Sequence, residues 1–108
     1  MYIAFSQRSD LNQHGDLMDN LEINYIDYFK KFGILPIVIP NTTKNLQSYF
    51  KELPIEAVIL TGGNDINPEL YGNQKTKESS ISKSRDDTEK QLLKIAIKNN
   101  LPVFGICR

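Results

Sequence analysis

The chain has 108 residues, and its 13 basic and 13 acidic residues give a formal net charge of zero. This length allows one domain, and the balanced charge gives no electrostatic reason to expect a nucleic acid or a membrane as partner. One cysteine cannot form an internal disulfide and one histidine cannot build a zinc site alone, so we expect no metal and no cofactor. The apolar run at residues 1–5 is too short for a signal peptide, and no apolar stretch approaches the roughly 20 residues of a membrane span. We therefore expect a soluble, cytoplasmic protein.

Apolar runs alternate with helical periodicity in the first part of the chain. Residues 2–6 form a short apolar run that predicts a first strand. From Met18 to Phe32 the apolar residues follow helical spacing, and Gly33 stands where a helix would end. Residues 34–40 are continuously apolar, as in a strand that is covered on both faces. These patterns predict a strand, a helix and a second strand.

A short helix and a third strand follow. Residues 41–43 offer N-cap oxygens to a helix that Pro54 closes. Residues 57–61 are β-branched and apolar, and they predict a third strand that ends at Gly62 and Gly63.

A long irregular stretch, residues 64–84, separates this strand from the last helix. A loop of about 20 residues in a compact domain is more often functional or mobile than filler. Asp86 and Glu89 resemble a capping box and predict a helix that runs to about Asn99. The residues expected to be buried are Leu92, Leu93, Ala96 and Ile97, and those expected to face water are Lys90, Lys94 and Lys98.

The order of these elements predicts the fold class. Strands that alternate with helices, with no hairpin signal between them, favour parallel pairing and right-handed crossovers. We therefore predict an α/β fold, a doubly wound and mostly parallel sheet with helices on both faces. Ligands of such sheets bind beyond the carboxyl ends of the strands.

Two segments carrying chemistry reach that edge of the predicted sheet. Residues 101–108 indicate a buried strand that runs into a Gly-x-Cys sequence, which is typical of a strand-to-helix elbow that presents a nucleophile, here Cys107. A thiolate that attacks a carbonyl needs hydrogen-bond donors for the oxyanion that forms. The amides of Gly62 or Gly63, together with that of Arg108, would supply them.

Each of these features also has a structural interpretation. Cys107 alone would be a small buried hydrophobe, and residues 62–63 could be a turn that needs positive φ. Residues 85–89 could cap and charge a helix, and Asp65 could form an Asx turn with nearby amides. His14 lies in a polar segment and is expected to be a solvated loop residue and not a catalytic base.

Three short sequences carry a family resemblance. Residues 61–72 read Thr-Gly-Gly-Asn-Asp-Ile-Asn-Pro-Glu-Leu-Tyr-Gly, residues 85–89 read Arg-Asp-Asp-Thr-Glu, and residues 101–108 read Leu-Pro-Val-Phe-Gly-Ile-Cys-Arg. In combination they resemble the class I glutamine amidotransferase-like hydrolases, specifically the γ-glutamyl hydrolase branch, and residues 25–40 also fit. The resemblance implies a flavodoxin-like sheet, with residues 1–108 as the amino-terminal half of a single domain and the sheet therefore truncated.

The resemblance also implies roles for individual residues. Cys107 would attack a γ-glutamyl amide and form a thioester that water later resolves. The amides of Gly63 and Arg108 would donate to the oxyanion, and the Arg108 side chain would meet a substrate carboxylate. The family's pattern continues with a His and a Glu that complete a catalytic triad, and neither follows Cys107 in this sequence. We therefore expect the chain by itself to be inactive.

Three functions remain open at this level. The first is a cysteine-dependent hydrolase of γ-glutamyl amide bonds, which acts on a small γ-glutamyl substrate and is completed by a carboxyl-terminal half. The second is a glutamine amidotransferase donor domain that passes ammonia to a synthetase partner chain. The third is a noncatalytic remnant or ligand-binding fragment.

Overall fold

Two sheets organise the described part of the chain, residues 1–42, 44–63 and 82–106 of a computed structural model. The main sheet contains β1 (Tyr2–Phe5), β4 (Leu35–Val38), β5 (Ile55–Leu60) and β6 (Val103–Gly105). The second is a hairpin of β2 (Arg8–Leu11) and β3 (Leu17–Asn20), which pair antiparallel.

The main sheet has the strand order of a flavodoxin-like fold. Its strands lie in the order β4-β1-β5-β6, so that the second strand along the chain neighbours the first, and the third and fourth follow on the other side. Each neighbouring pair is parallel. The prediction of a doubly wound, mostly parallel α/β sheet is confirmed.

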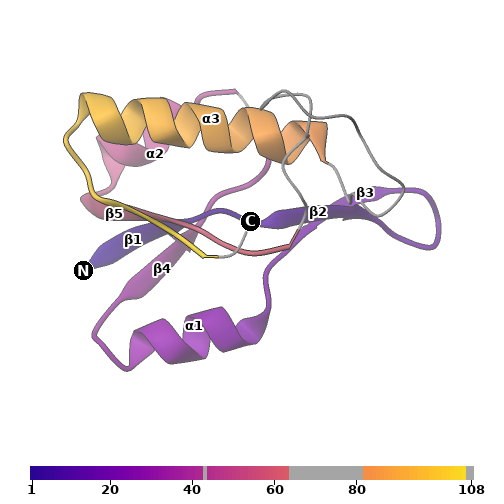
Figure 1. The fold of residues 1–108 in the computed structure, drawn as a ribbon, viewed down its shortest axis with the longest axis horizontal. Helices are drawn as coiled ribbons and strands as arrows, with labels where there is room; N and C mark the ends of the chain where they lie inside the picture. The colour runs from indigo at the N-terminus through magenta and orange to yellow at the C-terminus, as the bar shows by residue number, and fades with distance from the viewer. Residues whose placement is uncertain (43, 64–81, 107–108) are drawn as a thin grey trace.

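Helices cover both faces of this sheet (Figure 1). α1 (Ile23–Lys30) lies on one face, and α2 (Leu46–Glu52) and α3 (Lys83–Lys98) lie on the other. Right-handed crossovers require this arrangement, because the path from β1 to β4 crosses the sheet in the opposite direction from the two later crossovers.

The sheet divides the core into two clusters. The larger cluster packs with α2 and α3, and Ala4, Val58 and Leu92 are among its fully buried members. The smaller cluster lies toward α1, where the rings of Phe5 and Phe29 meet edge to face with centroids 5.2 Å apart. Successive residues of β1 point to opposite faces, so Ala4 and Phe5 serve different clusters.

The predicted helix from Met18 is wrong at its start, because α1 begins only after the β2–β3 hairpin. Asn12 shapes the hairpin loop: its Oδ1 accepts hydrogen bonds from the backbone N–H groups of His14 and Asp16 at 2.8 and 2.9 Å. Gly15 provides the positive φ of 80° in the same loop. All of β3 is exposed, so its sequence has no alternation of buried and polar residues that would indicate a strand.

The prediction that residues 41–43 cap α2 is also wrong for the two of them that the structure describes, residues 41 and 42. The N-cap residue is Asn45, in a left-handed conformation without a side-chain capping bond, and Thr43 lies outside the described residues. Asn41 is engaged elsewhere, since its backbone N–H and its side-chain amide donate to the Asp19 carboxylate at 2.8 and 2.9 Å. This contact ties β3 to the segment that follows β4.

The helix α3 begins earlier than the predicted capping box. Its N-cap is Ser82, whose Oγ accepts the backbone N–H of Arg85 at 3.2 Å, while Asp86 lies within the first turn. Residues 83–84 are therefore helical and not the end of the irregular stretch, of which residues 64–81 lie outside the described part. As predicted, Leu92 and Ala96 are buried and the three lysines are exposed; contrary to prediction, Leu93 and Ile97 are exposed.

The strands β4 and β6 are more exposed than their sequences predict. Leu35 in β4 is 50% exposed and Phe104 in β6 is 60% exposed. Among the strands that the structure describes, both are edges of the main sheet and have a strand neighbour on one side only. An apolar run in this chain therefore marks a strand without guaranteeing that both of its faces are covered.

Candidate functional site

The first part of the site is a buried polar contact between the ends of β1 and β5. The strand order reverses between these two strands, which makes their carboxyl ends the topological switch point of the sheet. Thr61 follows β5, and its backbone N–H donates to Ser6 Oγ at 3.0 Å while its Oγ1 donates to the Ser6 carbonyl at 2.9 Å. Both residues are fully buried. These bonds lock the two strand ends together, and no sequence pattern had singled them out.

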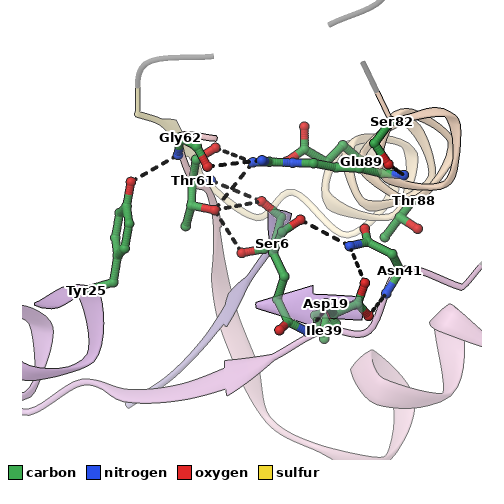
Figure 2. Close-up of polar contacts among 12 residues, drawn as sticks. Ser6, Asp19, Tyr25, Ile39, Asn41, Thr61, Gly62, Ser82, Thr88 and Glu89 are labelled. Atoms are coloured by element: carbon green, nitrogen blue, oxygen red, sulfur yellow. Dashed lines mark hydrogen bonds and ion pairs between the residues drawn. The ribbon is translucent and has the colours of Figure 1, made fainter. Parts of the chain in front are cut away.

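The backbone of Gly62 is held from both faces of the sheet. Its N–H donates to the Tyr25 hydroxyl on α1 at 3.0 Å, and its carbonyl accepts from Arg85 Nη1 on α3 at 3.0 Å. Figure 2 shows Tyr25 on one side of the Thr61–Gly62 segment and Glu89 of α3 on the other. Both polar groups of the Gly62 backbone are therefore already paired inside the protein.

Arg85 is a buried cation at the start of α3, with no exposed surface. Its Nη2 donates to the Thr61 carbonyl and to Glu89 Oε2, the latter at 3.1 Å, and its Nε donates to the same carboxylate oxygen at 3.2 Å. Glu89 is itself only 5% exposed. A buried charge is costly unless it is paired and hydrogen-bonded, and here both conditions are met. The guanidinium thus bridges a carboxylate and two successive carbonyls.

Sequence reasoning treated residues 85–89 as a helix cap and so missed this ion pair. A signal was present: Arg85 and Glu89 are spaced i,i+4 and fall on the same helical face as Leu92 and Ala96, which were predicted to be buried. An oppositely charged pair on the apolar face of a helix indicates a buried salt bridge. Tyr25 was also missed, because a tyrosine in an amphipathic helix is ordinarily read as packing only.

Gly63 occupies a position that requires glycine for two reasons. Its φ is +124°, which side chains rarely tolerate. A Cβ placed there would lie 2.8 Å from Arg85 Nη1 and 2.9 Å from the Cβ of Arg8. The structural interpretation of a turn that needs positive φ is thus correct for Gly63. No described residue accepts a hydrogen bond from the Gly63 amide.

The aliphatic part of the Arg8 side chain lies beside Gly63, where its Cβ and Cδ would be 2.9 and 3.5 Å from a Cβ added to the glycine. Arg8 Nε forms an ion pair with Asp10 Oδ2 at 2.8 Å, and Nη1 lies 3.4 Å from Glu22 Oε1. The hydrogen bond to Asp10 and the charges of both carboxylates raise the pKa of Arg8 above its ordinary value. The Arg8 guanidinium is therefore held by Asp10 and Glu22.

The strands β5 and β6 end side by side at this edge. Leu60 is the register partner of Gly105, and the Ile106 N–H donates to the Leu60 carbonyl at 2.8 Å. The predicted nucleophile Cys107, its neighbour Arg108 and the loop residue Asp65 lie outside the described residues.

His14, in contrast, is described, and it lies exposed in the β2–β3 loop, where its ring contacts Gln13. The interpretation of His14 as a solvated loop residue is therefore confirmed.

Within the described ranges, no group of three His, Cys, Asp or Glu side chains could hold a metal ion. None of the helices found there has both the length and the apolar character needed to cross a membrane.

An apolar groove runs between α1 and β6 on the face of Tyr25, with a volume of about 740 Å³. Its lining is largely aromatic and includes Tyr25, Tyr28, Phe29, Phe32, Phe104 and Ile106. Phe32 and Phe104 are both more than half exposed. Because Tyr25 lines the groove and also binds the Gly62 amide, the groove adjoins the polar site.

The fold and the matched motifs define an α/β domain of the class I glutamine amidotransferase-like type, as the sequence motifs predicted. The chain belongs to the Peptidase C26 family, whose profile matches residues 3–108.

Curated relatives agree with this assignment. The chain is 35% identical over 88 residues to a glutamine amidotransferase-like protein, the YvdE homolog of Lactococcus lactis subsp. cremoris, covering 79% of this chain and 45% of that protein. It is 40% identical over 82 residues to a gamma-glutamyl-CDP-amidate hydrolase of Campylobacter jejuni, covering 76% of this chain and 35% of the relative. A gamma-glutamyl-gamma-aminobutyrate hydrolase of Escherichia coli O157:H7 is 27% identical over 96 residues, covering 87% and 37% respectively. The chain spans less than half the length of these relatives.

Proposed function

We propose that this chain supplies the nucleophile-bearing part of a cysteine-dependent hydrolase of γ-glutamyl amide bonds. The observation that carries the proposal is the register of β5 and β6, in which Leu60 lies beside Gly105. With this register, Ile106 follows β6 beside the end of β5, and the proposal places the nucleophile one residue later near Gly62 and Gly63, next to the switch point where doubly wound folds bind ligands. Membership in the Peptidase C26 family supports hydrolytic chemistry at this edge.

The proposed reaction has two steps. A general base takes the proton of the Cys107 thiol, the thiolate attacks the γ-carbonyl carbon, and the carbon–nitrogen bond breaks as the base returns the proton to the leaving amine, which gives a γ-glutamyl thioester. Water then adds to the thioester, which releases the γ-carboxylate and restores the thiol. In each step an oxyanion forms and is stabilised by backbone donors.

Of the two glycines, Gly63 is better suited to donate to the oxyanion. The Gly62 N–H already donates to the Tyr25 hydroxyl, whereas no described residue accepts from the Gly63 amide. We assign the Gly63 amide and the Arg108 amide as the donors, with Gly62 shaping the segment between them and β5. The Arg108 side chain would bind a carboxylate of the small γ-glutamyl substrate.

The general base of this reaction is proposed to come from a carboxyl-terminal half of the same kind of domain. His14 is exposed in the hairpin loop, and no other histidine is present in the chain. The relatives are far longer than the matched segment, which is 35–45% of the proteins from Lactococcus lactis subsp. cremoris and Campylobacter jejuni. We assign the groove between α1 and β6 to this half, because its exposed aromatic lining would be buried by a packed apolar element.

A complementation experiment tests the proposal. The chain is combined with the carboxyl-terminal segment of the Campylobacter jejuni relative, and glutamate release from γ-glutamyl-p-nitroanilide is measured. We expect turnover only when both segments are present, and its loss in the Cys107→Ser variant. Turnover that survives Cys107→Ser would contradict the assignment of the nucleophile, and the absence of turnover from every combination would favour a noncatalytic fragment.

A second candidate is a glutamine amidotransferase donor domain. The similarity to glutamine amidotransferase-like proteins of Lactococcus lactis favours it. A domain of this kind would hydrolyse glutamine only when a synthetase chain accepts the ammonia. Glutaminase activity that appears with a synthetase partner, but not with a carboxyl-terminal half alone, would select this candidate over the hydrolase.

A further inference from the structure

The peptide bond between Gly62 and Gly63 carries the proposed oxyanion donor, and it joins two residues without side chains. Such a peptide can rotate as a unit, because no Cβ restricts the dihedral angles on either side of it. Rotation would turn the Gly63 N–H away from the place where an oxyanion forms. A working donor at this position therefore needs a contact that holds the peptide in one orientation.

We infer that Arg85 is the positioning residue that sets the direction of the Gly63 amide; the inference rests on the proposed function. The peptide bond is trans, so the Gly62 carbonyl and the Gly63 N–H point in opposite directions from one plane. From the α3 side, Arg85 Nη1 donates a hydrogen bond of 3.0 Å to the Gly62 carbonyl. The Gly63 N–H consequently points away from the guanidinium and cannot reverse while this bond is present.

The guanidinium is itself held in place. Glu89 accepts from both Nε and Nη2, at 3.2 and 3.1 Å, and Nη2 also donates to the Thr61 carbonyl. The planar donor fork of arginine can satisfy these acceptors together, whereas a lysine ammonium would place one point charge among them. On the opposite face Tyr25 holds the Gly62 N–H. The peptides on both sides of Gly62 are thus fixed before any substrate arrives.

Arg85 also acts on the strength of the donor. A cation bonded to a peptide carbonyl polarises that peptide, and the effect is larger in a buried environment, where screening is weak. Arg85 has no exposed surface, so its charge acts on the Gly62 carbonyl without screening by water. The Gly63 N–H on the same peptide becomes a better partner for a negative oxygen. Arg85 does this without touching the substrate.

The test compares two reactions of Cys107 that differ in their need for an oxyanion donor. Acylation by the γ-p-nitrophenyl ester of glutamate passes through an oxyanion, whereas alkylation by iodoacetamide does not. The double variant Arg85→Met/Glu89→Leu removes both buried charges and leaves neither unpaired. We expect acylation to fall about 100-fold, the loss typical of removing one oxyanion donor, and alkylation to remain unchanged. Equal acylation of variant and wild type would overturn the inference.

The chain offers a matched control on the same helix. Lys83 and Asp87 form an exposed ion pair with the same i,i+4 spacing, so Lys83→Met/Asp87→Leu makes the same kind of change away from the site. We expect this control to acylate at the wild-type rate.

A second readout does not depend on activity and separates the inference from the proposed function. In glycine-labelled protein, the Gly63 amide resonance and its hydrogen exchange are expected to change in the Arg85→Met/Glu89→Leu variant, while those of Gly15 and Gly33 do not. An unchanged Gly63 resonance overturns the positioning role. If wild type acylates no faster than Cys107→Ser, the proposed function fails, and the resonance alone then decides the role of Arg85. If the double variant does not fold, Arg85→Lys, which keeps the charge but loses the fork, is measured in the same way.

Discussion

The two faces of the sheet at the end of β5 differ in how far contacts within the chain satisfy their polar groups and bury their apolar side chains. On the α3 face, Arg85 is paired with Glu89 in the protein interior and donates hydrogen bonds to the carbonyls of Thr61 and Gly62. On the α1 face, beyond Tyr25, the groove toward β6 leaves aromatic side chains exposed. The polar groups of the α3 face are paired by hydrogen bonds, whereas the exposed aromatic side chains of the groove can be removed from water only by another packed element. The comparison indicates that contacts within the chain already hold the Thr61–Gly62 segment, whereas the groove on the α1 face is the surface that we propose a carboxyl-terminal half would cover.

The largest expected effect comes from breaking the buried ion pair between Arg85 and Glu89 on the α3 face. Arg85→Met alone leaves the Glu89 carboxylate buried without its cation, and we expect the free energy of unfolding to fall by about 3–5 kcal/mol. Urea unfolding measures this change. The double variant Arg85→Met/Glu89→Leu should recover only part of it, because no lone charge remains but the carbonyls of Thr61 and Gly62 still lack their donor. Equal stabilities for the single and double variants would show that the pair is not the buried unit described above.

The next effect tests the close packing around Gly63. Gly63→Ala adds a Cβ at φ +124° against Arg85 Nη1 and Arg8, and we expect a loss of about 2–4 kcal/mol in unfolding free energy. Gly15→Ala is the control, since its φ is also positive but nothing lies within 4 Å of the added Cβ. That control should cost about 1 kcal/mol from backbone strain alone. If both alanines cost the same in urea unfolding, the contact with Arg85 does not limit this position.

In the groove between α1 and β6 we expect a substitution to change stability little and to weaken association with another segment. Phe104 is 60% exposed, so Phe104→Ser should change the unfolding free energy by less than about 1 kcal/mol. It should nevertheless weaken association with the carboxyl-terminal segment used for complementation, measured by titration calorimetry. Leu11→Ser is the control, because Leu11 is similarly exposed but lies in the β2–β3 hairpin. Equal weakening by both variants would contradict the assignment of the groove as the docking surface.

The smallest effect is expected at the exposed ion pair of α3. The hydrogen bond to Asp87, together with its charge, raises the pKa of Lys83, but the lysine side chain is surrounded by water. A raised pKa means that any stabilisation is fully present below the ordinary lysine pKa and is lost only as the pH rises through the raised value. Because an exposed ion pair contributes little even where it is fully formed, Lys83→Ala should leave the thermal midpoint at neutral pH unchanged within error. A clear drop of the thermal midpoint at neutral pH would show that the exposed ion pair of α3 stabilises the fold more nearly as much as the buried pair than we infer.

Much of the framework could be predicted from the sequence. The apolar runs at residues 2–6 and 57–61 predicted β1 and β5, and the periodicity after Glu89 predicted the body of α3. These predictions succeeded because each pattern is local and repeats within one element. The β2–β3 hairpin was missed for the converse reason: β3 is exposed throughout, and Met18 happened to fit the helical spacing of the residues that follow it.

In the candidate site, too, residues within short local motifs could be predicted, whereas roles that depend on contacts between distant segments could not. Gly62 and Gly63 could be singled out because a glycine pair after a strand is a short, readable motif, and Cys107 because it follows a strand and a glycine. Arg85 could be singled out only as part of a cap, since its role depends on where the first turn of α3 lies against the end of β5. Exposure of the edge strands likewise depends on which neighbours a strand acquires.

By itself, the sequence determined the alternation of strands and helices, the parallel α/β class and the motifs at the ends of two strands. These follow from local periodicity and from the conformational freedom of glycine. The tertiary structure alone decided what holds Gly62: a hydroxyl 37 positions before it and a guanidinium 23 positions after it. Contacts between distant segments form only once the sheet brings the strand ends and the helices together, and such contacts leave no periodic pattern along the chain.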